Sequence, residues 1–195
     1  MSSPLLIKSQ GFQEGYAEIA TPRQTPLRWT TVGRLGLRQK ATYEGETGAQ
    51  EAVIALIGGA VTLEGDGFAP QATGARGDMF GDGPSYLCLP PGTAYRLTAT
   101  TYTADMMVFH APTDEGAGVH LVRPEDVPSR VVGASNWTRT VWPGTSMGNY
   151  TQRLLVGETI NPPGNWSSYP PHKHDTDNPP TEAVYEEVYC FSIKP

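Results

Sequence analysis

The sequence predicts an all-β fold of short strands that form small β-barrels or a jelly roll. The 195 residues include 22 glycines and 18 prolines spread along the chain, and such frequent turn residues favour short strands over long helices. Apolar and polar residues alternate in short runs, without a helix pattern longer than two turns or a short-period repeat. The hydrophobic fraction of 38% is enough for a packed core and argues against a disordered chain.

Strand signals separated by turn residues follow one another along the chain. Residues 51–65 predict two strands that meet at a Gly58-Gly59 hairpin turn. Residues 85–99 predict a strand, a Pro-Pro-Gly turn and a second strand. Further strands are expected within residues 105–112, 130–142 and 151–160. This spacing is typical of a sandwich or a small barrel.

The chain is expected to divide into two units. The polar, loop-like residues 111–130 predict a connector between them. The N-terminal unit, residues 1–120, is expected to contain a complete barrel from about Leu27 to Ala111. Residues 121–195 are expected to begin a second barrel.

The charge pattern favours a small acidic ligand over a nucleic acid. The formal net charge is -6 with a sequence pI near 5.2, and no cluster of Lys and Arg is present. Most of the positive charge is Arg, whose planar fork matches a carboxylate. An ordinary acidic protein without such a ligand explains the net charge equally well.

Cysteine usage and the N-terminus predict a cytoplasmic protein. Cys88 and Cys190 lie in separate apolar runs, which predicts buried free thiols and no disulfide. The first ten residues contain no apolar signal-peptide core, and no stretch approaches the length of a membrane span.

The stretch NWSSYPPHKHD, residues 165–175, carries two histidines one residue apart. If it is extended, His172 and His174 share one face and form a pair of ligands for a divalent metal. The segment YEEVYCFSI has a third ligand to offer, and strand parity leaves Glu186 and Glu187 both open. Two histidines in a Pro-rich surface loop without a role are the alternative.

These residues fit the frame of the cupin metal motif, His-x-His followed by Glu, with an insertion before the Glu. The N-terminal half has the same frame with other residues: Glu44 and Glu46 stand at the His-x-His positions, Glu51 at the position of the Glu, and Tyr95 at that of the later His. We therefore expect a first cupin that has lost its metal. A metal held by Glu44, Glu46 and Glu51 is the alternative.

GETINPPGNWSSYPPHKHD followed by EEVYCF resembles the 5-deoxy-glucuronate isomerases of myo-inositol catabolism, which share a two-cupin family with the 4-deoxy-5-hexulose-uronate isomerases of pectin breakdown. The resemblance implies one metal in the second cupin, zinc or alternatively manganese. Carried over, its ligands are His172, His174 and Glu187; the choice of Glu187 over Glu186 rests on the resemblance. A later histidine completes the family's ligand set.

The chain departs from the family at its end. Relatives continue for roughly another seventy residues, the usual size of a half-barrel, whereas this sequence ends at FSIKP, and neither His110 nor His120 matches the fourth ligand. We expect an incomplete second cupin with open strand edges. Either a homo-oligomer covers these edges or the C-terminal region is poorly ordered.

The resemblance implies isomerisation of 5-deoxy-glucuronate to 2-deoxy-5-keto-gluconate, with the sugar acid as small-molecule partner. The catalytic base is not identified, and Arg139, Arg153 and Lys173 are the candidates for holding the substrate carboxylate. Alternatives are the pectin-pathway isomerase and a cupin module that binds metal or sugar acid without turnover. Without the fourth ligand, we expect this chain to be a poor isomerase or none, although its full-length parent would be one.

Overall fold

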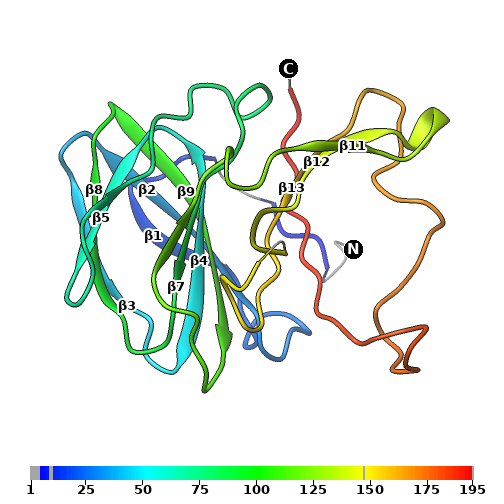
Figure 1. Cartoon of the computed structure of the whole chain (residues 1–195), viewed down its shortest axis with the longest axis horizontal. Helices are drawn as coiled ribbons and strands as arrows, with labels where there is room; N and C mark the ends of the chain where they lie inside the picture. The colour runs from blue at the N-terminus through cyan, green and yellow to red at the C-terminus, as the bar shows by residue number, and fades with distance from the viewer. Residues whose placement is uncertain (1–4, 9–10, 147, 195) are drawn as a thin grey trace.

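The computed structural model describes residues 5–8, 11–146 and 148–194. Part of the N-terminal segment in which we expect no signal peptide lies outside these residues. The described chain is almost entirely strand and loop, with two antiparallel sheets stacked face to face and a smaller third sheet beside them (Figure 1). The expectation of an all-β chain is confirmed. Within the described residues, no helix is long and apolar enough to cross a membrane.

The two stacked sheets form what we call the N-terminal sandwich, residues 15–122. The larger sheet contains, in spatial order, β1 (Gly15–Ala20), β2 (Thr31–Arg38), β9 (Thr103–Pro112), β4 (Gln50–Gly58), β7 (Tyr86–Leu89) and β10 (His120–Val122). The smaller contains β3 (Thr42–Glu46), β8 (Ala94–Ala99), β5 (Val61–Gly65) and β6 (Gln71–Ala72). Because no strand pairing among the described residues joins them, the unit is an open jelly-roll sandwich and not a closed barrel.

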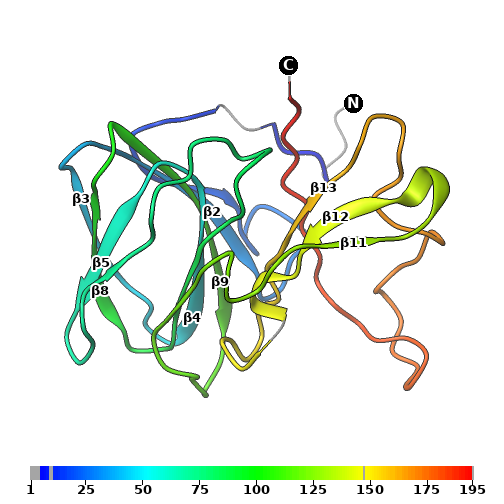
Figure 2. The same cartoon turned by 45° about the horizontal axis from the view of Figure 1, so that its top comes forward.

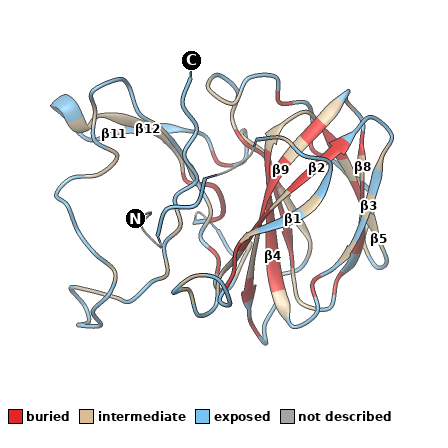
Figure 3. Cartoon of the chain, turned by 180° about the vertical axis from the view of Figure 1, so that it is seen from behind, coloured by how far each residue is buried: buried red, intermediate tan, exposed pale blue. Residues whose placement is uncertain are grey.

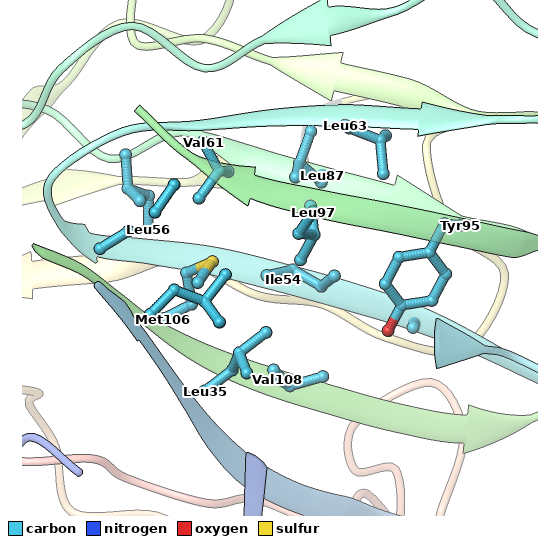
Figure 4. Packing of buried hydrophobic residues seen from close by; sticks show 14 of the residues in the cluster. Leu35, Ile54, Leu56, Val61, Leu63, Leu87, Tyr95, Leu97, Met106 and Val108 are labelled. Carbon is cyan, nitrogen blue, oxygen red and sulfur yellow. The ribbon is translucent and has the colours of Figure 1, made fainter. Parts of the chain in front are cut away.

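The main core of the sandwich fills the space between its two sheets. Figure 4 shows Ile54, Leu97 and Met106 meeting there from β4, β8 and β9, all almost fully buried. Strand β4 is buried on both faces: Ile54 points into this core, whereas Val53 belongs to a second apolar cluster on the outer face of the sheet. Burial on both faces explains why the sequence of β4 is a nearly continuous apolar run.

The predicted hairpin at Gly58-Gly59 is wrong. Strand β4 pairs with β7 and β9, whereas β5 pairs with β6 and β8, so the chain crosses from one sheet to the other at this point. Gly59 has a φ of +82°, and a Cβ there would lie 2.0 Å from the Thr103 carbonyl oxygen. Only glycine, which has no Cβ, fits where two backbone segments come this close. The sequence had suggested a hairpin turn at the same position.

The predicted connector, residues 111–130, contains a strand. Strand β10 pairs with β7, placing His120 opposite Cys88, and Val122 is buried in the second cluster. The predicted division of the chain at residue 120 stays a prediction, and it falls at the start of this strand.

The third sheet consists of β11 (Arg130–Val132), β12 (Arg139–Trp142) and β13 (Glu158–Ile160), with short 3-10 turns at Ser135–Trp137 and Gly144–Ser146. Of the strand predicted within residues 151–160, only the last three residues form one. Residues 161–194 contain no strand, and their last part runs between the third sheet and the sandwich (Figures 1 and 2).

The two cysteines differ in their surroundings. Cys88 is a buried free thiol, and burial raises its pKa to about 12. Cys190 is also free but exposed, so its expected burial is wrong. No strand among the described residues pairs with the segment that carries it.

Candidate functional site

The two histidines of the His-x-His motif lie together at the surface. Their ring centroids are 5.0 Å apart, although their loop is not a strand. His172 is exposed, and its Nδ1 lies 3.1 Å from the Pro170 carbonyl oxygen. His174 is half-buried.

Tyr185 connects the histidine loop with the segment that carries the two glutamates. Its backbone N–H donates to the His174 carbonyl oxygen over 3.0 Å, and its ring meets the His174 imidazole edge-on at 5.3 Å. Glu187 is therefore only two residues from a direct contact with the motif.

The chemistry and spacing of the pair fit a divalent metal, but a complete ligand set is not assembled. Two imidazoles on one tetrahedral ion, with bonds of about 2.1 Å, have ring centroids roughly 5 Å apart. Within the described residues, however, no three His, Cys, Asp or Glu side chains gather to hold an ion. Partial burial and the neighbouring Glu187 carboxylate, a hydrogen-bond partner, raise the pKa of Tyr189. Metal binding by His172, His174 and Glu187 stays a prediction.

The two adjacent glutamates have different surroundings. The Glu186 carboxylate accepts hydrogen bonds from the backbone N–H groups of Arg28, Trp29 and Thr30. Partial burial raises the pKa of Glu186, but these N–H groups outweigh it and hold the pKa below its usual value. Glu187 is exposed.

The three basic residues predicted to bind a substrate carboxylate differ in their partners and exposure. Lys173 Nζ lies 2.6 Å from Asp175 Oδ1 and is occupied. Arg153 is exposed. Arg139 is half-buried on β12, and its Nη1 donates to the Trp137 carbonyl oxygen over 3.1 Å. Among the described residues, Arg139 has no ion pair with a carboxylate.

The residues at the corresponding motif positions of the N-terminal sandwich do not face one another. Glu44 and Glu46 are exposed on the outer face of β3, and Arg96 Nη2 lies 2.7 Å from Glu44 Oε1. The intervening Gly45 faces inward, where its Cβ would lie 2.5 Å from the ring of Tyr95. Glu51 instead binds the N–H groups of residues 152–154, so the described structure does not gather Glu44, Glu46 and Glu51 around one ion.

Three tyrosine rings gather beside Gly45 in the sandwich. Tyr43 lies between Tyr16 and Tyr95, with ring centroids 6.0 Å and 6.3 Å away. Burial raises the pKa of Tyr95, and burial together with nearby Glu18 raises the pKa of Tyr16 to about 12. Burial also raises the pKa of Tyr43. All three phenols are neutral at physiological pH, so this region is an aromatic core.

Glu51 has a role that the sequence did not reveal. Its side chain is only 2% exposed, and its carboxylate accepts the backbone N–H groups of Gln152, Arg153 and Leu154, each over 2.7 Å. It therefore joins β4 to the C-terminal half of the chain. The available signal was a charged residue at the start of a run that is otherwise apolar and buried.

A second buried charge joins the same two parts of the molecule. Arg76 is 3% exposed and pairs with Glu158 of β13, with Nη1 3.0 Å from Oε2. Arg76 also lines a cavity of about 220 Å³ with Arg123 and Glu125. Because Arg76 is fully engaged with Glu158 and with backbone carbonyls, we do not assign this cavity a ligand.

Comparisons of the sequence with known proteins agree on one family. The model of the KduI/IolB family matches residues 5–195. The 5-deoxy-glucuronate isomerase of Geobacillus kaustophilus (strain HTA426) is 33% identical over 184 residues, 94% of this chain and 66% of the relative. That of Shouchella clausii (strain KSM-K16) is 31% identical over 174 residues, 88% of this chain and 64% of the relative.

A solved structure shows the same fold. An IolB-like protein from Salmonella typhimurium LT2 superimposes with a TM-score of 0.82 and 23% identity, over 92% of this chain and 68% of that one. The likeness confirms the predicted cupin-type fold across most of the chain. The chain spans about two thirds of the length of these relatives.

Proposed function

Because the chain belongs to the KduI/IolB family, we propose that it works in a sugar-acid isomerase that converts 5-deoxy-glucuronate to 2-deoxy-5-keto-gluconate. The observation that carries this proposal is the identity of 33% over 94% of the chain to a relative named for that activity. The paired imidazoles belong to residues 165–175, the stretch in which the sequence predicts metal ligands.

His172, His174 and Glu187 are proposed to hold a divalent ion, Zn²⁺ or Mn²⁺. The 5.0 Å between the imidazole rings supports this assignment, as does the exposure of Glu187. Such an ion supplies a Lewis acid for the adjacent carbonyl and hydroxyl oxygens of a sugar. A carboxylate has two oxygens, so Glu187 can bind an ion through one of them while the other accepts from the Tyr189 hydroxyl.

Arg139 is proposed to bind the carboxylate of the sugar acid. A half-buried guanidinium without a carboxylate partner is a strong site for a bidentate anion. The positive charge of Arg139 acts to lower the pKa of Tyr189, and the Tyr189 hydroxyl is hydrogen-bonded to Glu187, which supports a shared site for the three side chains. The ammonium of Lys173, in contrast, is neutralised by Asp175.

Tyr189 is proposed to orient the Glu187 carboxylate, to which its hydroxyl is hydrogen-bonded. Partial burial and the Glu187 carboxylate raise the pKa of its phenol, so it is protonated at neutral pH. A protonated phenol is a donor and not a ground-state base, which leaves the catalytic base unassigned.

The test is turnover of 5-deoxy-glucuronate by the purified chain with Zn²⁺ or Mn²⁺, followed by NMR of the product. His174→Ala is expected to lower kcat/KM by at least about 100-fold, because an ion with one imidazole is held weakly. Arg139→Lys is expected to raise KM by about 10-fold, since the planar fork is lost. Arg130→Lys, an exposed arginine of the same sheet, is the matched control and is expected to leave both parameters unchanged.

The same assay separates the alternatives. Preferred turnover of 4-deoxy-5-hexulose-uronate would replace the substrate with that of the pectin pathway. Metal or sugar-acid binding without turnover of either compound would make the chain a binding module. Full activity in His174→Ala would show that the site lies elsewhere.

A further inference from the structure

Three consecutive backbone N–H groups converge on one carboxylate where the N-terminal sandwich meets the C-terminal segment. Glu186 Oε2 lies 3.1 Å from the nitrogen of Trp29 and 2.9 Å from that of Thr30, and Oε1 accepts from Arg28. Successive N–H groups that point at one place form a concave site for an anion. Here a side chain 156 to 158 positions further along the chain occupies it.

The N–H groups belong to a firmly fixed part of the molecule. Residues 28–30 lead directly into β2, which pairs on one side with β1 and on the other with β9. The carboxylate of Glu186 is therefore attached to the frame of the larger sheet and not to a free loop.

Val188 provides a second attachment on the same side of the segment. Its side chain is half-buried and packs on the second apolar cluster of the sandwich. Alternate residues of an extended segment point in opposite directions. Glu186 and Val188 are held against the sandwich. The side chains of Glu187 and Tyr189, which point the other way, are exposed.

The attached segment is also the one that contacts the histidine motif. Tyr185, next to Glu186, donates its N–H to the His174 carbonyl oxygen over 3.0 Å. A shift of the segment by one residue would place Glu187 against residues 28–30, exchange the two glutamates and break the contact of Tyr185 with His174. The register is thus decided at position 186, where the carboxylate meets the N–H groups.

We propose that Glu186 is a positioning residue for the candidate site: its hydrogen bonds to residues 28–30 set the register of residues 185–188, so that Glu187 is the carboxylate available to His172 and His174. The inference rests on the proposed function, because it assumes that the two histidines and a glutamate act together. Glu186 itself touches neither the ion nor the substrate. It acts through Glu187.

Glu51 provides a matched control. It also binds three consecutive N–H groups across the same two parts of the chain, but those groups belong to residues 152–154, outside the histidine and glutamate segments. A merely structural role would make the loss of either carboxylate equivalent. A positioning role predicts that only the loss of Glu186 alters the metal site.

The experiment combines Co²⁺ absorption spectroscopy with hydrogen exchange on the full chain. In Glu186→Ala, the amides of Trp29, Thr30 and Tyr185 are expected to exchange at least about 10-fold faster, because the acceptor and the register are lost. Co²⁺ affinity is expected to fall at least about 10-fold with a changed visible spectrum. Glu186→Gln keeps one acceptor oxygen and is expected to recover part of both losses.

Two further variants decide the interpretation. Glu187→Gln is expected to weaken Co²⁺ binding while leaving the exchange of the Trp29 and Thr30 amides unchanged. Glu51→Gln is expected to accelerate exchange at residues 152–154 and to leave the Co²⁺ spectrum unchanged. Circular dichroism confirms for each variant that the sandwich is folded.

Three outcomes would overturn the proposal. Wild-type Co²⁺ affinity and spectrum in Glu186→Ala would show that Glu186 does not position the site. Loss of binding in Glu186→Gln with normal binding in Glu187→Gln would make Glu186 the ligand. A wild-type chain that binds no Co²⁺ would refute the metal site of the proposed function and with it the positioning role, while the exchange rates would still show whether Glu186 holds the segment.

Discussion

The N-terminal sandwich and the C-terminal region, residues 130–194, are stabilised in different ways. The sandwich has a core of fully buried side chains between its sheets, whereas Figure 3 shows the C-terminal region largely exposed. Many large apolar side chains of this region are exposed, namely those of Val131, Leu155, Trp166, Tyr169, Val184, Tyr185, Tyr189, Phe191 and Ile193. The region that carries the candidate chemistry therefore depends on the sandwich for its position.

Polar contacts make a large part of that connection. Glu51 and Arg76 of the sandwich bind residues 152–154 and Glu158, and Glu186 of the C-terminal region binds residues 28–30. Such contacts are directional, so they fix orientation where apolar packing would fix only proximity. Fold stability and site geometry therefore depend on different contacts in this chain, and each can be altered by its own substitutions.

The largest expected effect is in the core of the sandwich. Leu97→Ala removes a fully buried side chain of β8 and is expected to lower the free energy of unfolding by about 4 kcal/mol, because a cavity remains. Phe191→Ala, at a position 82% exposed, is expected to change it by less than about 0.5 kcal/mol. Chemical denaturation measures both. Similar losses at the two positions would contradict the comparison.

Loss of the Glu51 carboxylate tests the connection between the two regions. Glu51→Ala leaves three backbone N–H groups without an acceptor and is expected to destabilise the chain by about 3 kcal/mol. Glu46→Ala, an exposed glutamate of the same sandwich, is the control and is expected to have no measurable effect. If unfolding of Glu51→Ala remains a single unchanged transition in urea, the two regions do not depend on this carboxylate.

The crossing between the sheets tests how closely the backbone of the sandwich is packed. Gly59→Ala is expected to destabilise by about 2 kcal/mol more than Gly67→Ala. The two glycines have φ angles of +82° and +83°, but nothing lies within 4 Å of a Cβ at Gly67, whereas Gly59 meets the Thr103 carbonyl. Equal losses in thermal denaturation would mean that only the backbone angle matters.

A smaller effect is expected from His110 of β9. Burial lowers the pKa of this imidazole, although nearby Glu18 raises it in part. The unfolded chain therefore takes up the proton first as the pH falls through about 6.5, and the free energy of unfolding decreases until the lower folded pKa is passed. His110→Asn is expected to flatten the dependence between about pH 7 and pH 5, measured by urea denaturation. A slope unchanged from wild type would contradict this.

Local features of the sequence predicted much of the fold, because alternation and turn residues act over short distances. The strands that contain Ile54 and Tyr95 were expected from this pattern alone. The partners of β4 were not, because strand pairing depends on contacts distant in sequence. A Gly-Gly pair suits a hairpin turn and a crossing between sheets equally well, so Gly58 and Gly59 alone do not distinguish the two.

The candidate site was predictable to the same extent. The motif drew attention to His172 and His174, and their rings do lie together. Strand parity was unable to separate Glu186 from Glu187, because the distinction depends on N–H groups at residues 28–30. The role of Glu51 was missed for the same reason, since its partners are about one hundred residues away.

We propose that metal affinity belongs to the C-terminal region and not to the sandwich. Titration of the chain with Co²⁺, followed by absorption and by equilibrium dialysis, tests this proposal. We predict one bound ion per chain, lost when His172→Ala and His174→Ala are combined and retained in His120→Asn, a histidine of β10. Unchanged binding in the double variant, or loss of binding in His120→Asn, would contradict the claim.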